Sequence, residues 1–122
     1  MNAGTSLLRQ INPNFFQGDR VTSQAFRPTP KDQQRLSVDD GDQIDPSESY
    51  ERFTSRTECR SIGVMAVTNG ECAALNLGVI ADGIPYKEHA SIDFQGLSNS
   101  LVEKRGKQLT VHARQRGWLF QP

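Results

Sequence analysis

Ser-Ile-Gly-Val-Met-Ala-Val, residues 61–67, is the clearest β-strand that the sequence predicts. A near-continuous apolar run of this length is typical of a strand that is covered on both of its faces. We therefore expect residues 61–67 to occupy a central position in a sheet, with other strands on either side.

The four residues that follow this strand allow two interpretations. Asn69-Gly70 between apolar runs is a good hairpin turn, whereas Thr68-x-x-Glu71 is a capping box that opens a helix. The continuation Cys72-Ala73-Ala74-Leu75 favours the helix, because alanine is depleted in strands.

Four further segments have the character of strands. Residues 7–11 are a short apolar run that predicts a strand or a helical turn, and residues 21–27, closed by Pro28, predict an extended strand. Residues 35–38 predict a brief strand. Residues 89–94 alternate strictly, so the side chains at positions 90, 92 and 94 should share one buried face.

Two longer helices are expected. In the segment 45–48, Asp is the cap, Pro takes the first helical position and Glu completes a capping box, and this helix should fade near Arg56. The last helix opens with Ser100-x-x-Glu103 and ends at Gly117. Residues 118–120, Trp-Leu-Phe, then either dock on the core or meet a partner, and we expect docking. The buried stripe of the last helix comprises Val102, Gly106, Leu109 and Ala113.

These elements place the chain in the α+β class. We expect a small mixed or antiparallel sheet packed against two to three helices, in a single domain that spans residues 1–122. A chain of 122 residues can bury a core without disulfides or metals. Because only 35% of the residues are hydrophobic and the mean hydropathy is −0.59, that core should be thin and the surface loops long.

The charge balance limits the kinds of partner. Fourteen basic and fourteen acidic residues cancel, so no global field favours nucleic acid or an anionic membrane, and nucleic-acid binding is not expected. No apolar run is long enough to cross a bilayer. The N-terminal residues 1–6 lack the pattern of a signal peptide, which favours a cytoplasmic location. The oligomeric state stays open.

We expect neither a metal nor a cofactor. Cys59 and Cys72 are single thiols outside any Cys-x-x-Cys pair, and we expect both to act as small buried hydrophobes. The acidic group that begins at Asp40 fails as a calcium loop, because Asp45 stands where that loop requires glycine.

The polar segment 20–32 predicts a binding loop. It combines cations, hydroxyls and two prolines, and prolines hold a loop in a fixed extended geometry. Fixed cations beside hydroxyls and backbone amides would form a cradle for phosphate or carboxylate, although Arg–Asp pairs could equally brace the loop. The candidate ligand-binding residues here are Arg20, Ser23, Arg27 and Lys31, with Asp32 as the bracing acid.

His89 is the leading single candidate, for catalysis or for ligand binding. It begins an alternating strand and shares one face of that strand with Ser91 and Asp93. A histidine beside a carboxylate can act as acid, base or hydrogen-bond donor near neutral pH. The alternative is that it only caps the strand. We expect Arg27 and His89 to approach the same cleft, because each lies at a strand end beside a proline-containing loop.

Two resemblances accompany these residues. The segments 8–37, 88–94 and 113–119 resemble a set of small, uncharacterised bacterial proteins, which implies no established activity. More loosely, Arg9, Thr22-Ser23 and Glu88 are similar to the strand-borne arginine, the serine/threonine strand and the late glutamate of ADP-ribosyltransferase-type domains. That similarity implies catalytic candidates at Arg9 and Glu88, which join His89, the candidate from its own strand position.

The sequence thus favours a small cytoplasmic bacterial binding protein that engages an anionic ligand or a protein partner. A role in a toxin–antitoxin, immunity or defence locus suits a chain of this size. The alternative is an enzyme that acts on a nucleotide-like substrate and uses His89 with Arg9 or Arg27.

Overall fold

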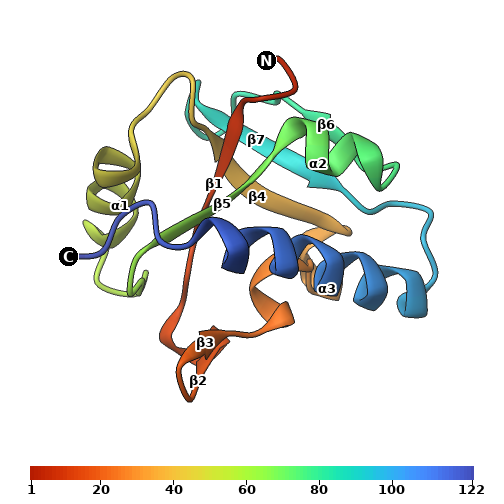
Figure 1. Cartoon of the computed structure of the whole chain (residues 1–122). Coiled ribbons are helices and arrows are strands. Elements are labelled where there is room, and N and C mark those ends of the chain that lie inside the picture. The colour runs from red at the N-terminus through yellow and green to blue at the C-terminus, as the bar shows by residue number, and fades with distance from the viewer.

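A computed structural model describes the whole chain, residues 1–122, apart from the side chain of Pro30 (Figure 1). Its centre is a five-stranded sheet in which every neighbouring pair is antiparallel, in the order β5-β1-β4-β7-β6. The strands are β1 (Ser6–Gln10), β4 (Arg35–Asp40), β5 (Val64–Thr68), β6 (Gly78–Ile80) and β7 (His89–Asp93). The expected small α+β domain is therefore confirmed, with an antiparallel sheet.

Three α-helices and several short elements complete the fold. The helices are α1 (Pro46–Thr54), α2 (Asn69–Ala74) and α3 (Asn99–Arg116). A two-stranded ribbon and three 3₁₀ turns occupy the first third of the chain: β2 (Phe16–Gln17), β3 (Arg20–Val21), η1 (Pro13–Phe15), η2 (Ser23–Phe26) and η3 (Pro30–Asp32). None of the helices described is long and apolar enough to cross a membrane.

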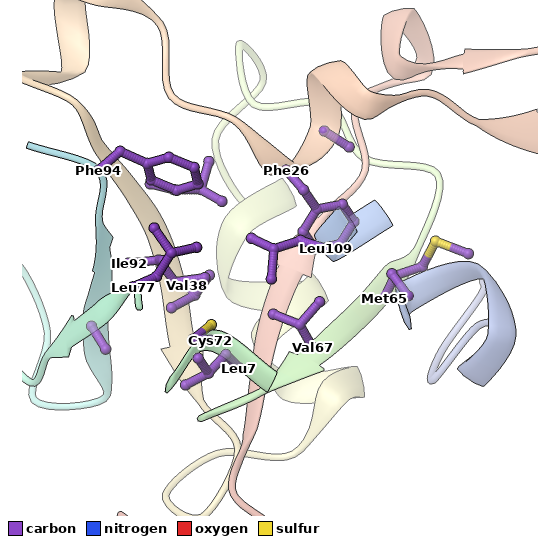
Figure 2. Packing of buried hydrophobic residues seen from close by; sticks show 14 of the residues in the cluster. Leu7, Phe26, Val38, Met65, Val67, Cys72, Leu77, Ile92, Phe94 and Leu109 are labelled. Atoms are coloured by element: carbon purple, nitrogen blue, oxygen red, sulfur yellow. The ribbon is translucent and has the colours of Figure 1, made fainter. Parts of the chain in front are cut away.

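The central strand β1 serves two separate apolar clusters. Successive strand residues point to opposite faces, and Leu7 accordingly joins the main core, in which Leu109 of α3 and Phe26 of η2 also lie (Figure 2). Leu8 joins a smaller cluster on the other face, against Tyr50 of α1. Helices α3 and α1 thus cover opposite faces of the sheet.

The apolar segment 61–67 does not lie in the centre of the sheet. β5 begins only at Val64 and occupies the edge, so the expected central position is wrong. It is nevertheless buried on both faces, because Val67 faces the main core and Ala66 faces the α1 cluster. Its outer edge is closed by the C-terminal segment, where Val64 N donates to Phe120 O at 2.9 Å. Residues 61–67 are therefore apolar because β5 is buried on both faces, although the strand lies at the edge of the sheet.

The segment 21–27 forms a strand only at its start. β3 ends at Val21, and the chain continues as the 3₁₀ turn η2. Ala25 and Phe26 are both fully buried in the same core. Adjacent residues of a strand point to opposite faces, so an extended segment could not bury both of them on one side. The predicted strand is wrong for this reason.

The observed helix starts agree with the predicted caps, with two exceptions. The Thr68–Glu71 capping box forms as expected, with Glu71 N donating to the Thr68 hydroxyl at 3.1 Å and Thr68 N donating to Glu71 at 2.8 Å. Helix α1 begins at Pro46, but the Asp45 side chain makes no capping hydrogen bond. Helix α3 begins earlier than expected, because Ser98 rather than Ser100 caps it.

The expected stripe of α3 is buried, and its glycine sets the distance to η2. A Cβ atom on Gly106 would lie 3.0 Å from Arg27 Cβ and 3.4 Å from the carbonyl oxygen of Phe26. The helix can approach the turn this closely because position 106 has no side chain. Gly106 therefore fixes how α3 holds η2 against the sheet.

Truncation after Gly117 should destabilise the isolated protein. The Trp118 ring lies 6.0 Å from the Phe16 ring, the Phe120 ring lies 5.1 Å from that of Tyr50, and the backbone pairs with Val64. Loss of two packed aromatic side chains should cost several kcal/mol and lower the melting temperature by roughly 10 °C. Thermal unfolding measures this, with removal of Gln121 and Pro122 alone as the control. An unchanged melting temperature would show that the segment is not docked.

Candidate functional site

A cavity of about 340 Å³ opens between α1 and the face of the sheet formed by β1, β4 and β7. Helix α1 spans only nine residues and packs against β1 and β5. It therefore leaves β4 and β7 open on this face. Five charged side chains and two polar rings line the cavity. They are Arg9, Asp39, Arg52, Arg56 and Arg60, with Tyr86 and His89.

Arg9 lies where β1 and β4 separate. The two strands pair at only two positions, Leu7 with Asp40 and Leu8 with Asp39. Beyond that point Arg9 donates from Nε to the Ala25 carbonyl at 2.8 Å and from Nη1 to the Ser37 carbonyl at 3.0 Å. These two bonds hold the guanidinium group in a fixed orientation.

Arg9 is a half-buried cation without a carboxylate partner among the described residues. Burial lowers the pKa of Arg9 to about 10, although the more distant Asp32 carboxylate opposes that shift, so the group stays charged at neutral pH. No described carboxylate forms an ion pair with it. Its Nη2 has no described protein partner and is not sealed from solvent. The free edge of the guanidinium is therefore available to a ligand.

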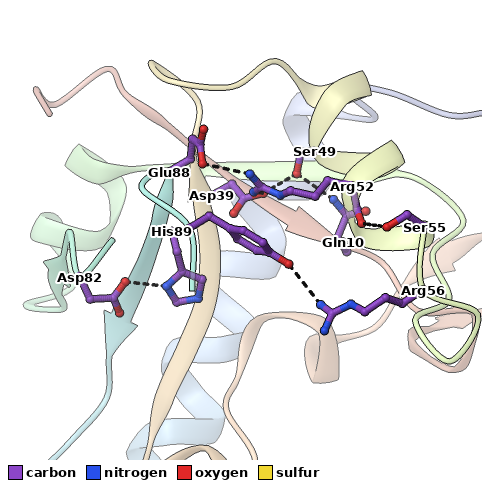
Figure 3. A network of polar contacts seen from close by, with 10 residues as sticks. Gln10, Asp39, Ser49, Arg52, Ser55, Arg56, Asp82, Glu88 and His89 are labelled. Atoms are coloured by element: carbon purple, nitrogen blue, oxygen red, sulfur yellow. Dashed lines mark hydrogen bonds and ion pairs between the residues drawn. The ribbon is translucent and has the colours of Figure 1, made fainter. Parts of the chain in front are cut away.

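Arg52, in contrast, is fully engaged within the protein (Figure 3). Its guanidinium contacts Asp39 at 2.9 Å and Glu88 at 3.0 Å, and its central carbon lies 3.8 Å from the centre of the Tyr86 ring. Ser49 donates a further hydrogen bond to Asp39 at 2.7 Å. The pKa of Glu88 is lowered by its own backbone N–H and by Arg52. Arg52 therefore holds α1 against β4 and the loop before β7.

Arg56 and Arg60 contribute positive charge at the rim of the cavity. Both side chains are exposed, and no described carboxylate pairs with either of them. Arg56 donates to the Tyr86 hydroxyl at 3.3 Å. Arg9, Arg56 and Arg60 have no carboxylate partner among the described residues, whereas Arg52 has two, so these four arginines and two carboxylates together carry a net charge of +2.

His89 is oriented by an aspartate that lies seven residues earlier. Its Nδ1 lies 2.6 Å from Asp82 Oδ1, and the Ser91 hydroxyl donates to Asp82 Oδ2 at 2.9 Å. Burial raises the pKa of Asp82, but these hydrogen bonds outweigh burial and the pKa is lowered. Figure 3 shows the second ring nitrogen of His89 pointing away from Asp82, toward the side on which Arg56 lies. His89 therefore presents Nε2 to the cavity.

The predicted site residues divide between two places. Arg9 and His89 line the same cavity, and Glu88 adjoins it through Arg52. Arg27 lines a second depression of about 590 Å³, beside the N-terminal part of α3, and lies 3.8 Å from Glu103. The expectation that Arg27 and His89 share one cleft is therefore wrong. The cause is η2, which carries Arg27 against Gly106 of α3.

The other candidate residues of the polar segment, Arg20, Ser23 and Lys31, line neither of these two depressions. Arg20 and Lys31 are exposed, and Ser23 begins η2. Asp32 accepts hydrogen bonds from the backbone N–H of Thr29 at 3.1 Å and from its hydroxyl at 2.8 Å. Asp32 therefore stabilises the loop through its hydrogen bonds with Thr29.

The sequence interpretation missed the arginines of α1 and its following loop. Arg52 lies in the last turn of α1, whereas Arg56 and Arg60 follow the end of that helix at Thr54, so no helix face relates the three. The available signal was that three arginines occur within nine residues. No sequence pattern indicated the pairing of Asp82 with His89, because that pairing depends on the path of the loop between β6 and β7.

Comparison of the chain with protein-family models, curated proteins and solved structures gave no match. Among the described side chains, no group of three or more His, Cys, Asp or Glu residues gathers as a metal site would require. Cys72 is buried, and burial raises the pKa of its thiol to about 12, so it packs as a small apolar side chain. Cys59 is only partly buried.

Replacement of Arg52 by Met should destabilise the fold. Asp39 and Glu88 would then lie half-buried without their counter-charge, so the melting temperature should fall by about 5 °C or more at pH 7. The loss should shrink as the pH is lowered from 7 through 4.5 and below, because Glu88, whose pKa is held below 4.5, then loses its charge. Thermal unfolding across this pH range measures both effects. Arg56→Met, which removes only the contact with Tyr86, is the control; equal losses in both variants would contradict the assignment.

Proposed function

We propose that the cavity between α1 and the sheet binds a small anionic ligand. The observation that carries the proposal is Arg9, a half-buried guanidinium fixed by two backbone carbonyls, with no carboxylate partner among the described residues. An isolated buried charge is costly unless an opposite charge or hydrogen bonds compensate it. An anion in the cavity would supply the missing charge, and the fixed orientation of Arg9 suits recognition by two parallel hydrogen bonds.

The walls of the cavity favour a ligand that also carries an apolar or aromatic part. Leu8, Phe15, Val38, Phe53 and Pro85 contribute apolar lining beside the arginines. At about 340 Å³ the cavity lies near the lower end of the roughly 300–1,000 Å³ that is usual for small-molecule sites. These properties support a compact ligand in which one anionic group is attached to a ring or a short apolar body.

Removal of the two rim arginines should weaken anion binding without unfolding the protein. Arg56→Gln/Arg60→Gln should bind phenyl phosphate at least about tenfold more weakly, since each lost charge-assisted contact contributes about 1.5–3 kcal/mol. Isothermal titration calorimetry measures the affinity. Arg20→Gln is the matched control, because Arg20 is an exposed arginine outside the cavity. Equal binding by the double variant, or weakened binding by Arg20→Gln alone, would move the site elsewhere.

A second function, an enzyme that acts on a nucleotide-like substrate, is favoured by one specific observation. His89, oriented by Asp82, lines the same cavity as Arg9. A carboxylate that orients an imidazole is a common arrangement for acid–base chemistry. The similarity to ADP-ribosyltransferase-type domains draws support from Arg9 alone, because Glu88 is bound by Arg52 and the Thr22 hydroxyl donates to the Phe15 carbonyl.

Turnover is the test of this second function. Incubation with labelled NAD, mononucleotides or RNA should give a product that is lost in His89→Ala and retained in His112→Ala, which lies on α3 beside Glu71. No product from the unmodified protein would leave ligand binding as the function. A product that persists in His89→Ala would remove His89 from the mechanism.

A protein partner, a bacterial origin, a cytoplasmic location and a role in a toxin–antitoxin, immunity or defence locus stay predictions. The bacterial origin follows from the resemblance to small bacterial proteins, the location from the N-terminal pattern and the type of locus from the size of the chain. None of these predictions is argued from a described contact. The anionic ligand is the part of the expectation for which the cavity supplies physical support.

A further inference from the structure

We propose that the anion is a phosphate monoester and that His89 takes up a proton when it binds. The proposal rests on the proposed anion-binding function of the cavity and specifies the chemical class of its ligand. It also assigns His89 as the residue that distinguishes a dianion from a monoanion.

The charge of the cavity fits a dianion once His89 is protonated. Arg9, Arg52, Arg56 and Arg60 carry four positive charges, and Asp39, Glu88 and Asp82 carry three negative ones, so one positive charge remains around a neutral His89 and two remain around a protonated one. A carboxylate would bring one negative charge and would need no proton on His89. A phosphate monoester brings about −1.5 to −2 at neutral pH and three acceptor oxygens. Guanidinium groups bind such oxygens in pairs.

The hydrogen bonds around His89 fix which nitrogen faces the ligand. Asp82 is held in its ionised form and can only accept, so Nδ1 of His89 carries the proton that lies between them. In the neutral ring, Nε2 then presents a lone pair to the cavity. A lone pair repels an anion, and one proton taken from solvent converts Nε2 to a charged donor.

Several charged groups surround His89 and set the sign of this effect. Asp82 faces it from the preceding loop, and Asp39 is its cross-strand neighbour in β4. Asp39 is already bound by Ser49 and by Arg52 of α1, which also engages Glu88. Arg9 of β1 and Tyr86 share the cavity. A bound dianion adds negative charge on the Nε2 side, which favours the protonated ring.

The step is balanced in protons and charge. We consider the neutral ring, in which only Nδ1 of His89 carries a proton beside the anionic Asp82, and a phosphate monoester that carries two negative charges. After binding, one solvent proton lies on Nε2 and is donated to a phosphate oxygen, while Nδ1–H still donates to Asp82. No covalent bond is formed or broken, and no co-reactant is needed.

Phenyl phosphate and phenyl sulfate provide a matched pair of probes. They have nearly the same shape and the same number of terminal oxygens, but the sulfate ester carries only one negative charge. Calorimetric titration at pH 7.5 in buffers of different ionisation enthalpy measures both affinity and proton exchange. We expect phenyl phosphate to bind at least about tenfold more tightly than phenyl sulfate. We also expect a net uptake of protons when phenyl phosphate binds and none when phenyl sulfate binds.

Variants assign the proton to its residue. In His89→Gln, proton uptake and the preference for phosphate should both disappear, while His112→Gln, the matched histidine control on α3, should retain both. If His89→Gln fails to fold, the titrations of the unmodified protein still test the proposal, because proton uptake and the preference for phosphate are both measured on that protein. Equal binding of the two probes, or binding of phosphate without proton uptake, would overturn the inference and leave the anion site intact. Failure of both probes to bind would instead overturn the proposed function.

Discussion

The separation of β1 from β4 is the feature on which both the fold and the cavity depend. A continuous ladder between these strands would use the backbone carbonyl groups that now face a gap. Arg9 lies at that gap and donates to the carbonyl of Ser37 in β4 and to that of Ala25 in η2, so both backbone acceptors are paired. The same side chain ties the turn η2 to the sheet. The side chain of Arg9 thus supplies hydrogen bonds at the place where the β1–β4 ladder is interrupted.

This replacement places a charge where an apolar side chain would be expected. Burial disfavours the charged form of arginine, and two neutral carbonyl groups compensate only part of its lost hydration. The protein neutralises Arg52 with two carboxylates but leaves Arg9 without any among the described residues. Two arginines on one cavity wall therefore have different physical roles: Arg52 joins elements of the fold, and Arg9 keeps a free edge for binding.

Much of the fold was predictable because it follows from local rules. The capping box at Thr68 and the apolar stripe of α3 depend on residues close in sequence, and both formed as expected. The position of the segment 61–67 was not predictable in the same way. Burial on both faces makes a strand apolar whether it lies at the centre or at an edge that another segment closes. Here the edge is closed by Phe120, more than fifty residues away.

The candidate site was predictable only in part, for a related reason. Arg9 and His89 were recognisable as single residues, but their neighbours depend on tertiary structure. Arg27 was assigned to the same cleft on the assumption that residues 21–27 form a strand. The need to bury both Ala25 and Phe26 folds that segment into η2 and directs Arg27 to α3 instead. Asp82 reaches His89 through a loop whose path no local pattern encodes.

The position of the cavity follows from the unequal lengths of the two helices that cover the sheet. Helix α3 has 18 residues and its stripe meets the main core, so the strand positions that face it must be apolar. Alternation along β4 and β7 then forces Ser37, Asp39, His89 and Ser91 onto the opposite face. Helix α1, with nine residues, is too short to cover β4 and β7 as well as β1 and β5. The polar face of β4 and β7, opposite α3, is therefore left open beside α1. That opening is the cavity that Arg9 and His89 both line.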